Sequence, residues 1–216
     1  MKKGLTEIVF ILDRSGSMYG LEADTIGGFN STLEKQKKLE GEAFVTTVLF
    51  DDQIQFLHHR EPLMKIPNMT TRDYFVGGST ALLDAIGRSI TGIGNIQRYT
   101  PEDYRAQKVI CIIITDGMEN ASREYNYQSI KQMVERQKQL YGWEFIFLGA
   151  NIDALATAGR MGISRDRASN YCADSKGTEV NYEALNDVIS DVRCFKQVKE
   201  NWNQKIDADY MKRKQN

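Results

Sequence analysis

Three short polar segments carry residue types that could hold a metal ion together. One aspartate and two serines alternate in Asp13-x-Ser15-x-Ser17, and Gly16 relieves crowding between the serines. Thr80 and Asp116 lie far along the chain. Two carboxylates and three hydroxyls form an all-oxygen donor set, which suits Mg²⁺ or Mn²⁺ rather than zinc. This set is too small to complete an octahedron, so one coordination position would be open to water or a guest.

Each of these segments adjoins the end of a predicted strand or helix. The apolar runs Glu7–Leu12 and Val109–Ile114 end at polar turns that contain Asp13 and Asp116, as buried strands do when they lead into loops. Thr80 directly precedes an amphipathic helical stripe. The candidate ligands therefore lie where strands end and a helix begins.

The rest of the chain alternates helical and strand patterns. Apolar spacing predicts helices over 25–41, from 82 to at least 93, and over 130–141, 153–161 and 178–195. Strands are predicted over 7–12, 43–50, 53–57, 109–114, 143–148 and 168–172. This order predicts an α/β fold with a doubly wound, mostly parallel six-stranded sheet of order 3-2-1-4-5-6, its third strand antiparallel and helices on both faces.

That strand order makes the first and fourth strands neighbours at the point where the order reverses. Asp13 and Asp116 should therefore converge at the carboxyl edge of the sheet. We expect residues 1–195 to form the domain and residues 196–216 to be a helical extension or tail of it.

Several side chains have simpler structural roles in this interpretation. Cys111 is expected in the core, while His58 and His59 are expected in solvent at a strand end. The last helix should turn Phe195 inward, with Val198, Trp202 and Ile206 continuing its stripe. The apolar positions of the helix over 130–141 include Leu140 and Tyr141, and Trp143, Phe145 and Phe147 alternate as they would in a buried strand.

The three polar segments together resemble the von Willebrand factor A (VWA) family. Its metal-ion-dependent adhesion site (MIDAS) combines a D-x-S-x-S loop with a distant Thr and Asp, and all five positions are filled here. The resemblance covers roughly residues 5–195 and implies a Rossmann-like VWA fold in a stand-alone bacterial type of protein. It further implies that Ser15, Ser17 and Thr80 ligate the ion through hydroxyls, while Asp13 and Asp116 hold it directly or through water.

Each segment taken alone also has a purely structural interpretation. Asp13 and Ser17 could form an N-cap with turn bonds, and Thr80 could cap the helix that follows it. Glu119 and Asn120 could line the rim of the site or be ordinary polar loop residues.

The function implied by the resemblance is a non-enzymatic module that captures an Asp or Glu of a partner protein through the ion. The alternative is a metal-assisted hydrolase or phosphotransferase using the same acidic site. Position 15 is Ser where a D-x-D pattern would need Asp, and the sequence contains no P-loop, G-x-S-x-G or H-E-x-x-H motif. An accessory subunit of a larger assembly is a third possibility, and the sequence leaves the partner and the oligomeric state open.

Composition excludes several other classes of function. The 216 residues include 28 Lys and Arg against 29 Asp and Glu, so no net positive field attracts nucleic acid or an anionic membrane. Three cysteines without C-x-x-C spacing fit reduced thiols, and the N-terminal sequence does not resemble a signal peptide. We therefore expect a cytoplasmic protein.

Overall fold

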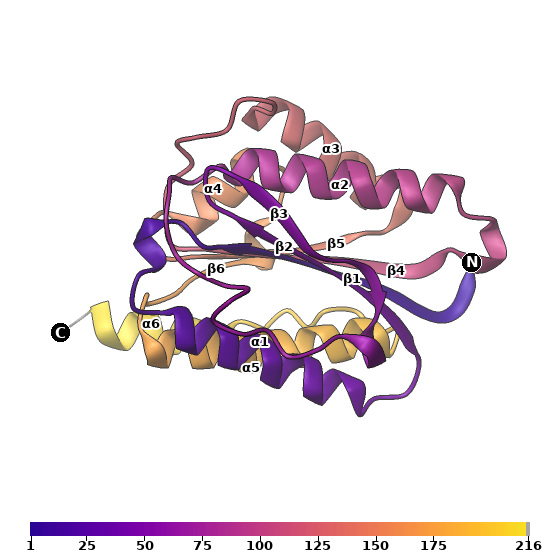
Figure 1. Cartoon of the computed structure of the whole chain (residues 1–216), viewed down its shortest axis with the longest axis horizontal. Helices are drawn as coiled ribbons and strands as arrows, with labels where there is room; N and C mark the ends of the chain where they lie inside the picture. Colours follow the sequence, from indigo (N-terminus) through magenta and orange to yellow (C-terminus); the bar gives the residue numbers. More distant parts are fainter. Residues whose placement is uncertain (215–216) are drawn as a thin grey trace.

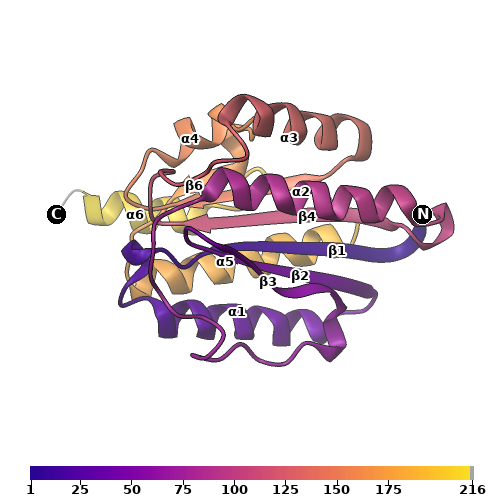
Figure 2. The same ribbon diagram turned by 45° about the horizontal axis from the view of Figure 1, so that its top comes forward.

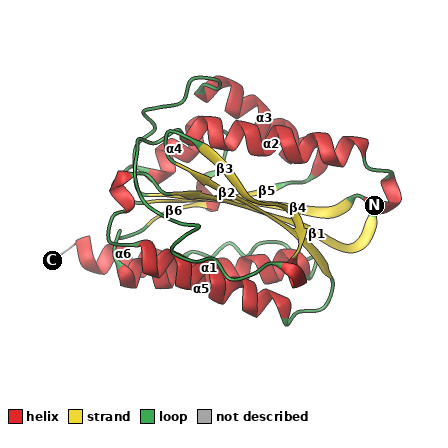
Figure 3. Cartoon of the chain, in the orientation of Figure 1, coloured by secondary structure: helices red, strands yellow, loops and turns green. Residues whose placement is uncertain are grey.

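A six-stranded sheet forms the centre of the computed structural model, which describes residues 1–214 (Figures 1 and 3). The strand order is β3-β2-β1-β4-β5-β6; β3 is antiparallel to β2, and the other neighbours are parallel. This architecture confirms the predicted fold class. The strands are β1 Lys2–Asp13, β2 Glu42–Phe50, β3 Ile54–Pro62, β4 Ala106–Thr115, β5 Glu144–Gly149 and β6 Ala168–Asn170.

Helices cover both faces of the sheet. Figures 1 and 2 show α2, α3 and α4 on one face and α1, α5 and α6 on the other. The helices are α1 Glu22–Lys37, α2 Leu82–Tyr99, α3 Tyr127–Tyr141, α4 Ala154–Arg160, α5 Ser175–Arg193 and α6 Gln204–Lys214.

The strand side chains divide the core into two layers. On β1, Phe10 and Leu12 pack towards α1 and α5, whereas Val9 and Ile11 pack towards α2 and α3. Because both faces of the central strands are buried, the sequences of these strands are continuous apolar runs. Cys111 lies in the core as predicted. Trp143, Phe145 and Phe147 are all buried on the α2 and α3 side, which confirms their predicted alternation.

The prediction for His58 was wrong. Strand β3 continues to Pro62, and irregular pairing with β2 turns the His58 side chain inward, where 5% of the residue is exposed. Its Nδ1 lies 3.0 Å from the Thr47 hydroxyl and its ring stacks on Phe29. Burial lowers the pKa of His58. His59 is exposed, as expected.

The ends of two helices also differ from the prediction. Leu140 and Tyr141 are 65% and 58% exposed, whereas Ile130 and Val134 of the same helix α3 are buried. Helix α5 ends at Arg193 and the chain turns at Phe195, whose φ is 59° and whose side chain is partly exposed. The predicted inward position of Phe195 was therefore wrong.

After this turn the C-terminal segment returns to the sheet. Val198, Trp202 and Ile206 are buried in the same core layer as α5. The Trp202 indole donates a hydrogen bond to the Asp166 carbonyl at 2.8 Å, and the Ser169 hydroxyl donates to Asp207. Residues 198–207 thus pack beside the short strand β6. Within residues 1–214, no helix is both long enough and apolar enough to cross a membrane.

Candidate metal centre

The predicted ligands lie on three loops at the carboxyl edge of the sheet. Strands β1 and β4 are direct neighbours (Figure 2). Leu12 is aligned to Ile114, so Asp13 and Asp116 lie just beyond paired positions. Backbone hydrogen bonds join the loop after β1 to the segment before α2. The Gly16 N–H donates to the Gly78 carbonyl at 3.1 Å, and the Gly77 N–H donates to the Arg14 carbonyl at 2.9 Å.

The loop after β4 is joined to the same segment around Thr80. The backbone N–H groups of Asn120 and Ala121 donate to the Thr80 carbonyl, at 3.0 and 3.2 Å. The Asn120 side chain accepts a hydrogen bond from the Thr80 N–H at 2.9 Å. Asn120 therefore positions Thr80, which is a more specific role than lining the rim of the site.

The three predicted hydroxyls surround one small space beside Gly117. A Cβ atom placed on Gly117 would lie 3.0 Å from the Ser17 Oγ, 3.0 Å from the Thr80 Oγ1 and 3.7 Å from the Ser15 Oγ. The two serine oxygens are 3.1 Å apart. Gly117 was not among the predicted site residues, although its place directly after Asp116 was a usable signal.

The two carboxylates have different hydrogen-bonding environments. Asp13 accepts a hydrogen bond from the Ser15 N–H on one oxygen, at 2.7 Å, and from the Thr115 hydroxyl on the other. Asp116 Oδ1 accepts from the Ser17 hydroxyl. Asp116 Oδ2 is buried and has no hydrogen-bond partner among the described residues. A buried charged oxygen without a partner is costly, and a cation would supply the missing interaction.

Burial dominates the electrostatics of both carboxylates. It raises the pKa of Asp13 to about 6; hydrogen bonds from Thr115 and Ser15 oppose this shift, and the nearby Asp116 charge adds to it. Burial also raises the pKa of Asp116, against the hydrogen bond from Ser17. Without a cation, the folded protein therefore holds both negative charges at a cost.

The helix-capping alternative does not account for Thr80. The N-cap of α2 is Ala81, and no side chain caps this position. Asp13 does form a turn bond to the Ser15 N–H, as the structural interpretation expected. That bond occupies one oxygen of Asp13 and leaves the hydroxyls of Ser15, Ser17 and Thr80 gathered beside Gly117.

The loop after β4 is held in place by two acidic side chains. Glu119 accepts hydrogen bonds from the backbone N–H groups of Leu83, Ala121 and Ser122, at 2.8 to 3.0 Å, and from the Ser122 hydroxyl at 2.7 Å. The Glu119 carboxylate therefore stabilises the conformation of this loop.

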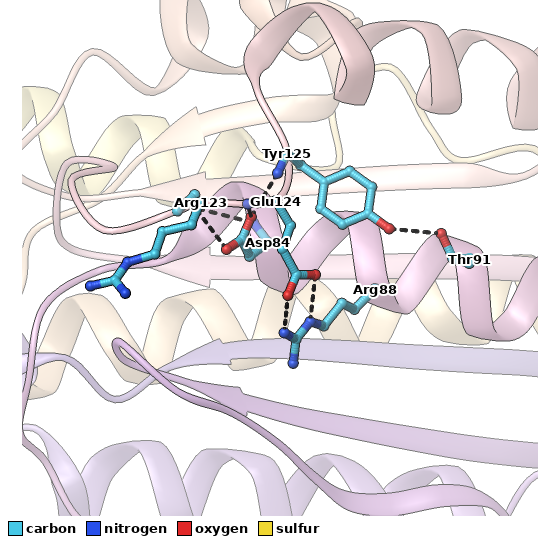
Figure 4. Close-up of polar contacts among 7 residues, drawn as sticks. Asp84, Arg88, Thr91, Arg123, Glu124 and Tyr125 are labelled. Atoms are coloured by element: carbon cyan, nitrogen blue, oxygen red, sulfur yellow. Dashed lines mark hydrogen bonds and ion pairs between the residues drawn. The ribbon is translucent and has the colours of Figure 1, made fainter.

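Asp84, in the first turn of α2, accepts from three successive backbone N–H groups at 2.8 to 2.9 Å, those of Arg123, Glu124 and Tyr125 (Figure 4). Asp84 was not among the predicted site residues. The only feature of the sequence that pointed to Asp84 was its acidic side chain in the first turn of a predicted helix.

Two further residues support the loop after β1. The Tyr74 hydroxyl is buried and donates to the Asp13 carbonyl at 2.5 Å. Arg14 is buried too, with its Nε 3.0 Å from Asp51 and its Nη1 donating to Gln55 at 2.8 Å. The positive charge of Arg14 is thereby paired with Asp51.

The donor chemistry fits a hard divalent cation. Within residues 1–214, no three His, Cys, Asp or Glu side chains converge as metal ligands, so a cation at this edge would depend on hydroxyl donors. Asp116 Oδ2 and the hydroxyls of Ser15, Ser17 and Thr80 supply oxygen alone, the ligand type that Mg²⁺ and Mn²⁺ prefer.

Comparison with known proteins supports the fold. No protein-family model matches the sequence, and no curated protein matches it. Solved structures of similar fold include a von Willebrand factor type A protein from Catenulispora acidiphila, with a TM-score of 0.54 and 14% identity over 85% of this chain and 42% of that one. The D319A mutant of the PilB minor pilin from Streptococcus sanguinis has a TM-score of 0.58 and 13% identity over 89% of this chain and 63% of that one.

A third similar structure is the proximal thread matrix protein 1 from the mussel byssus, described with a zinc-occupied MIDAS motif. It has a TM-score of 0.53 and 15% identity over 88% of this chain and 45% of that one. The chain thus spans between 42% and 63% of the lengths of these three proteins. At such low identity the likeness shows the fold alone, and that fold is the Rossmann-like fold of VWA domains.

Proposed function

We propose that this chain, which has a VWA fold, holds Mg²⁺ or Mn²⁺ at a MIDAS and uses it to bind an acidic side chain of a partner protein. Asp116 would supply its unpartnered oxygen, while Ser15, Ser17 and Thr80 would supply hydroxyls. Asp13 would hold the ion directly or through ordered water.

One observation carries this proposal. Asp116 Oδ2 is buried without a hydrogen-bond partner, and its neighbour Gly117 leaves a small space that three hydroxyls surround. The backbone hydrogen bonds of Gly16, Gly77 and Asn120 hold these loops together, so the donor set would be assembled before the ion binds. Preassembly favours binding because the loops lose little further conformational entropy when the ion binds.

Partner capture follows from the number of donors. A bound ion supplies a coordination position that the chain does not fill, and a carboxylate from outside is the natural hard ligand for it. The neighbouring side chains hold the loops that would present this position to the partner. Tyr74 fixes the backbone at Asp13, Glu119 fixes the loop that carries Gly117, and Asn120 joins that loop to Thr80.

Binding explains the surroundings better than catalysis does. His58 is buried between β3 and α1, and His59 is exposed on the edge strand β3, so neither is placed to move a proton at the three loops. Cys111 is buried in the core, and burial raises the pKa of its thiol far above its usual range. The side chains that surround the space beside Gly117 are the candidate ligands Ser15, Ser17 and Thr80.

A peptide selection tests this function. Random heptapeptides displayed on phage are selected on the immobilised protein in Mn²⁺ or Mg²⁺ and eluted with EDTA. We expect the eluted sequences to be enriched in Asp or Glu, and synthetic peptides with Asp changed to Asn to lose binding. Equal recovery without metal, or no enrichment of acidic residues, would contradict partner capture through an ion.

A further inference from the structure

Three large apolar side chains are exposed on the loops that carry the candidate ligands. Tyr19 is 84% exposed, Phe75 is 55% exposed and Met118 is 71% exposed. Tyr19 follows Ser17 by two residues, and Met118 directly follows Gly117. What distinguishes these three from other exposed apolar side chains is that they lie on the loops of the candidate ligands.

Phe75 reaches the same region from a different part of the chain. The Arg14 guanidinium lies over its ring, 4.8 Å from the ring centroid. Arg14 stands between Asp13 and Ser15, and its carbonyl accepts a hydrogen bond from the Gly77 N–H. Phe75 is therefore held beside the loop after β1 although it is distant from that loop in sequence.

Such a group of side chains is suited to contact with another protein. Exposed apolar patches mark binding sites, whereas single exposed apolar side chains are normal. Here three such side chains lie on the loops that carry the candidate ligands. Aromatic residues and methionine are enriched in protein interfaces, where a few well-packed side chains supply most of the binding energy. A carboxylate bound to an ion fixes the position of a partner but buries little apolar surface.

A negative charge lies at the same edge. Asp52 is exposed in the turn between β2 and β3, and its carboxylate lies against Gly78, which has a φ of +70° and no side chain. The Gly78 carbonyl accepts the hydrogen bond from Gly16, in the loop of candidate ligands. A partner with a second carboxylate close to the first would be repelled by Asp52.

From these observations we infer that the partner segment carries a single Asp or Glu flanked by apolar or aromatic residues, which pack on Tyr19, Phe75 and Met118. This inference rests on the proposed function, because the central acidic residue is the one that the ion would hold. It adds the sequence that must surround that residue.

The metal-eluted heptapeptides test the inference directly. We expect the positions beside the enriched Asp or Glu to be enriched in Leu, Ile, Phe, Tyr or Trp and depleted in further acidic residues. Synthetic peptides that differ only in these flanking positions, apolar against Gly and Ser, should differ about tenfold in affinity at constant Mg²⁺.

Single variants identify the surface responsible. Tyr19→Ser, Phe75→Ser and Met118→Ser should each weaken the apolar-flanked peptide about threefold to tenfold. Each should leave Mg²⁺ affinity unchanged. Tyr104→Ser is the matched control, since Tyr104 is 67% exposed but precedes β4, at the opposite end of that strand from Asp116. It should leave both affinities unchanged.

The outcomes separate the two proposals. Acidic, metal-dependent peptides with no preference at the flanking positions would keep the proposed function and overturn this inference. Peptides whose binding does not need metal or an acidic residue would overturn both. Loss of peptide binding in Tyr104→Ser equal to that in Met118→Ser would also overturn the inference, because the effect would not be local to the three side chains.

Discussion

At the scale of single residues, Gly117 is the position where the smallest change should matter most. Its missing side chain leaves the space between Ser17 and Thr80 open, and its φ lies outside the left-handed region that favours glycine. Gly117→Ala should therefore weaken Mg²⁺ affinity by at least about tenfold, a free energy of about 1.4 kcal/mol, with little effect on unfolding. Calorimetric titration and urea denaturation measure the two quantities.

The matched control for this change is Gly159→Ala. Gly159 is exposed in helix α4 with open space around it, so alanine should raise the free energy of unfolding by about 0.5–1 kcal/mol and leave Mg²⁺ affinity unaltered. Unchanged metal affinity in Gly117→Ala would mean that the ion does not occupy the space beside Gly117.

The raised pKa of Asp13 predicts how stability depends on pH without metal. The folded state keeps this proton up to a pKa of about 6, whereas the unfolded chain releases it near 4. Folded protein thus binds more protons between these values, so the free energy of unfolding should fall as pH rises from about 4 to about 6, by about 3 kcal/mol at most. Burial of Asp116 acts in the same direction.

Urea denaturation in metal-free buffer across this range measures the effect. Asp13→Asn keeps the shape of the side chain but removes its charge, so its stability should change less between pH 4 and pH 7 than that of the wild type. Parallel pH profiles for the two proteins would contradict the assignment to Asp13.

The convergence of the candidate ligands at one edge of the sheet could be predicted from the sequence, because strand ends and helix starts are visible in hydrophobic patterns. Their roles as ligands remain a prediction. The partnerless oxygen of Asp116 could not be predicted, because it depends on which hydroxyls face which carboxylate oxygen. Tyr74 and Arg14 were missed for a similar reason. Their buried contacts with Asp13 and Asp51 join segments that nothing in the local pattern connects.

At the scale of elements, the junction between α2 and the loop after β4 depends on Asp84. Its carboxylate accepts three backbone hydrogen bonds (Figure 4). Asp84→Asn places an amide N–H group against one of these donors and should lower the free energy of unfolding by about 2 kcal/mol. Mg²⁺ affinity should also fall, because this loop carries Gly117 and braces Thr80.

Arg88, also on α2, provides the control for the Asp84 variant. It forms an exposed ion pair with Glu124, next to the Asp84 bonds (Figure 4). Exposed pairs contribute little because solvent screens them, so Arg88→Gln should barely move the midpoint of denaturation. Equal effects of Arg88→Gln and Asp84→Asn would contradict the role given to Asp84.

Helices and strands could be told apart from the sequence wherever consecutive residues are buried, as in the apolar runs of β1 and β4. The residues at which helices and strands end were harder to predict. β3 extends past His58 because pairing with β2 continues, and the inward turn of His58 depends on irregular register that alternation along one strand does not reveal. The chain likewise leaves the α5 direction at Phe195, through a left-handed backbone conformation that a hydrophobic stripe cannot predict.

At the scale of the whole molecule, the C-terminal segment packs beside β6, the edge strand that lies two places from β4 in the sheet. Trp202 is 8% exposed and packs in the core layer under α5. Trp202→Ala should lower the free energy of unfolding by about 3–5 kcal/mol, while Trp202→Phe should cost less because it keeps most of the apolar surface. Both should retain wild-type Mg²⁺ affinity, and a parallel loss of affinity and stability would show that the two regions are coupled.

Metal binding should stabilise the whole fold, because the folded state alone assembles the three loops. At a free Mg²⁺ concentration about a hundredfold above the dissociation constant, the expected gain is about 2.7 kcal/mol. Thermal denaturation with increasing Mg²⁺ should show a rising midpoint for the wild type. For Gly117→Ala, the same curve should be displaced to higher Mg²⁺ concentrations.

The central claim is that Asp116 and the surrounding hydroxyls hold one divalent ion. Its most direct test is calorimetric titration of Mg²⁺ and Mn²⁺ into metal-stripped wild type and into Asp116→Asn, with urea denaturation confirming that the variant is folded. We predict one ion per chain in the wild type and no measurable binding in a folded Asp116→Asn. Wild-type affinity in that variant, or no binding of either ion to the wild type, would contradict the claim.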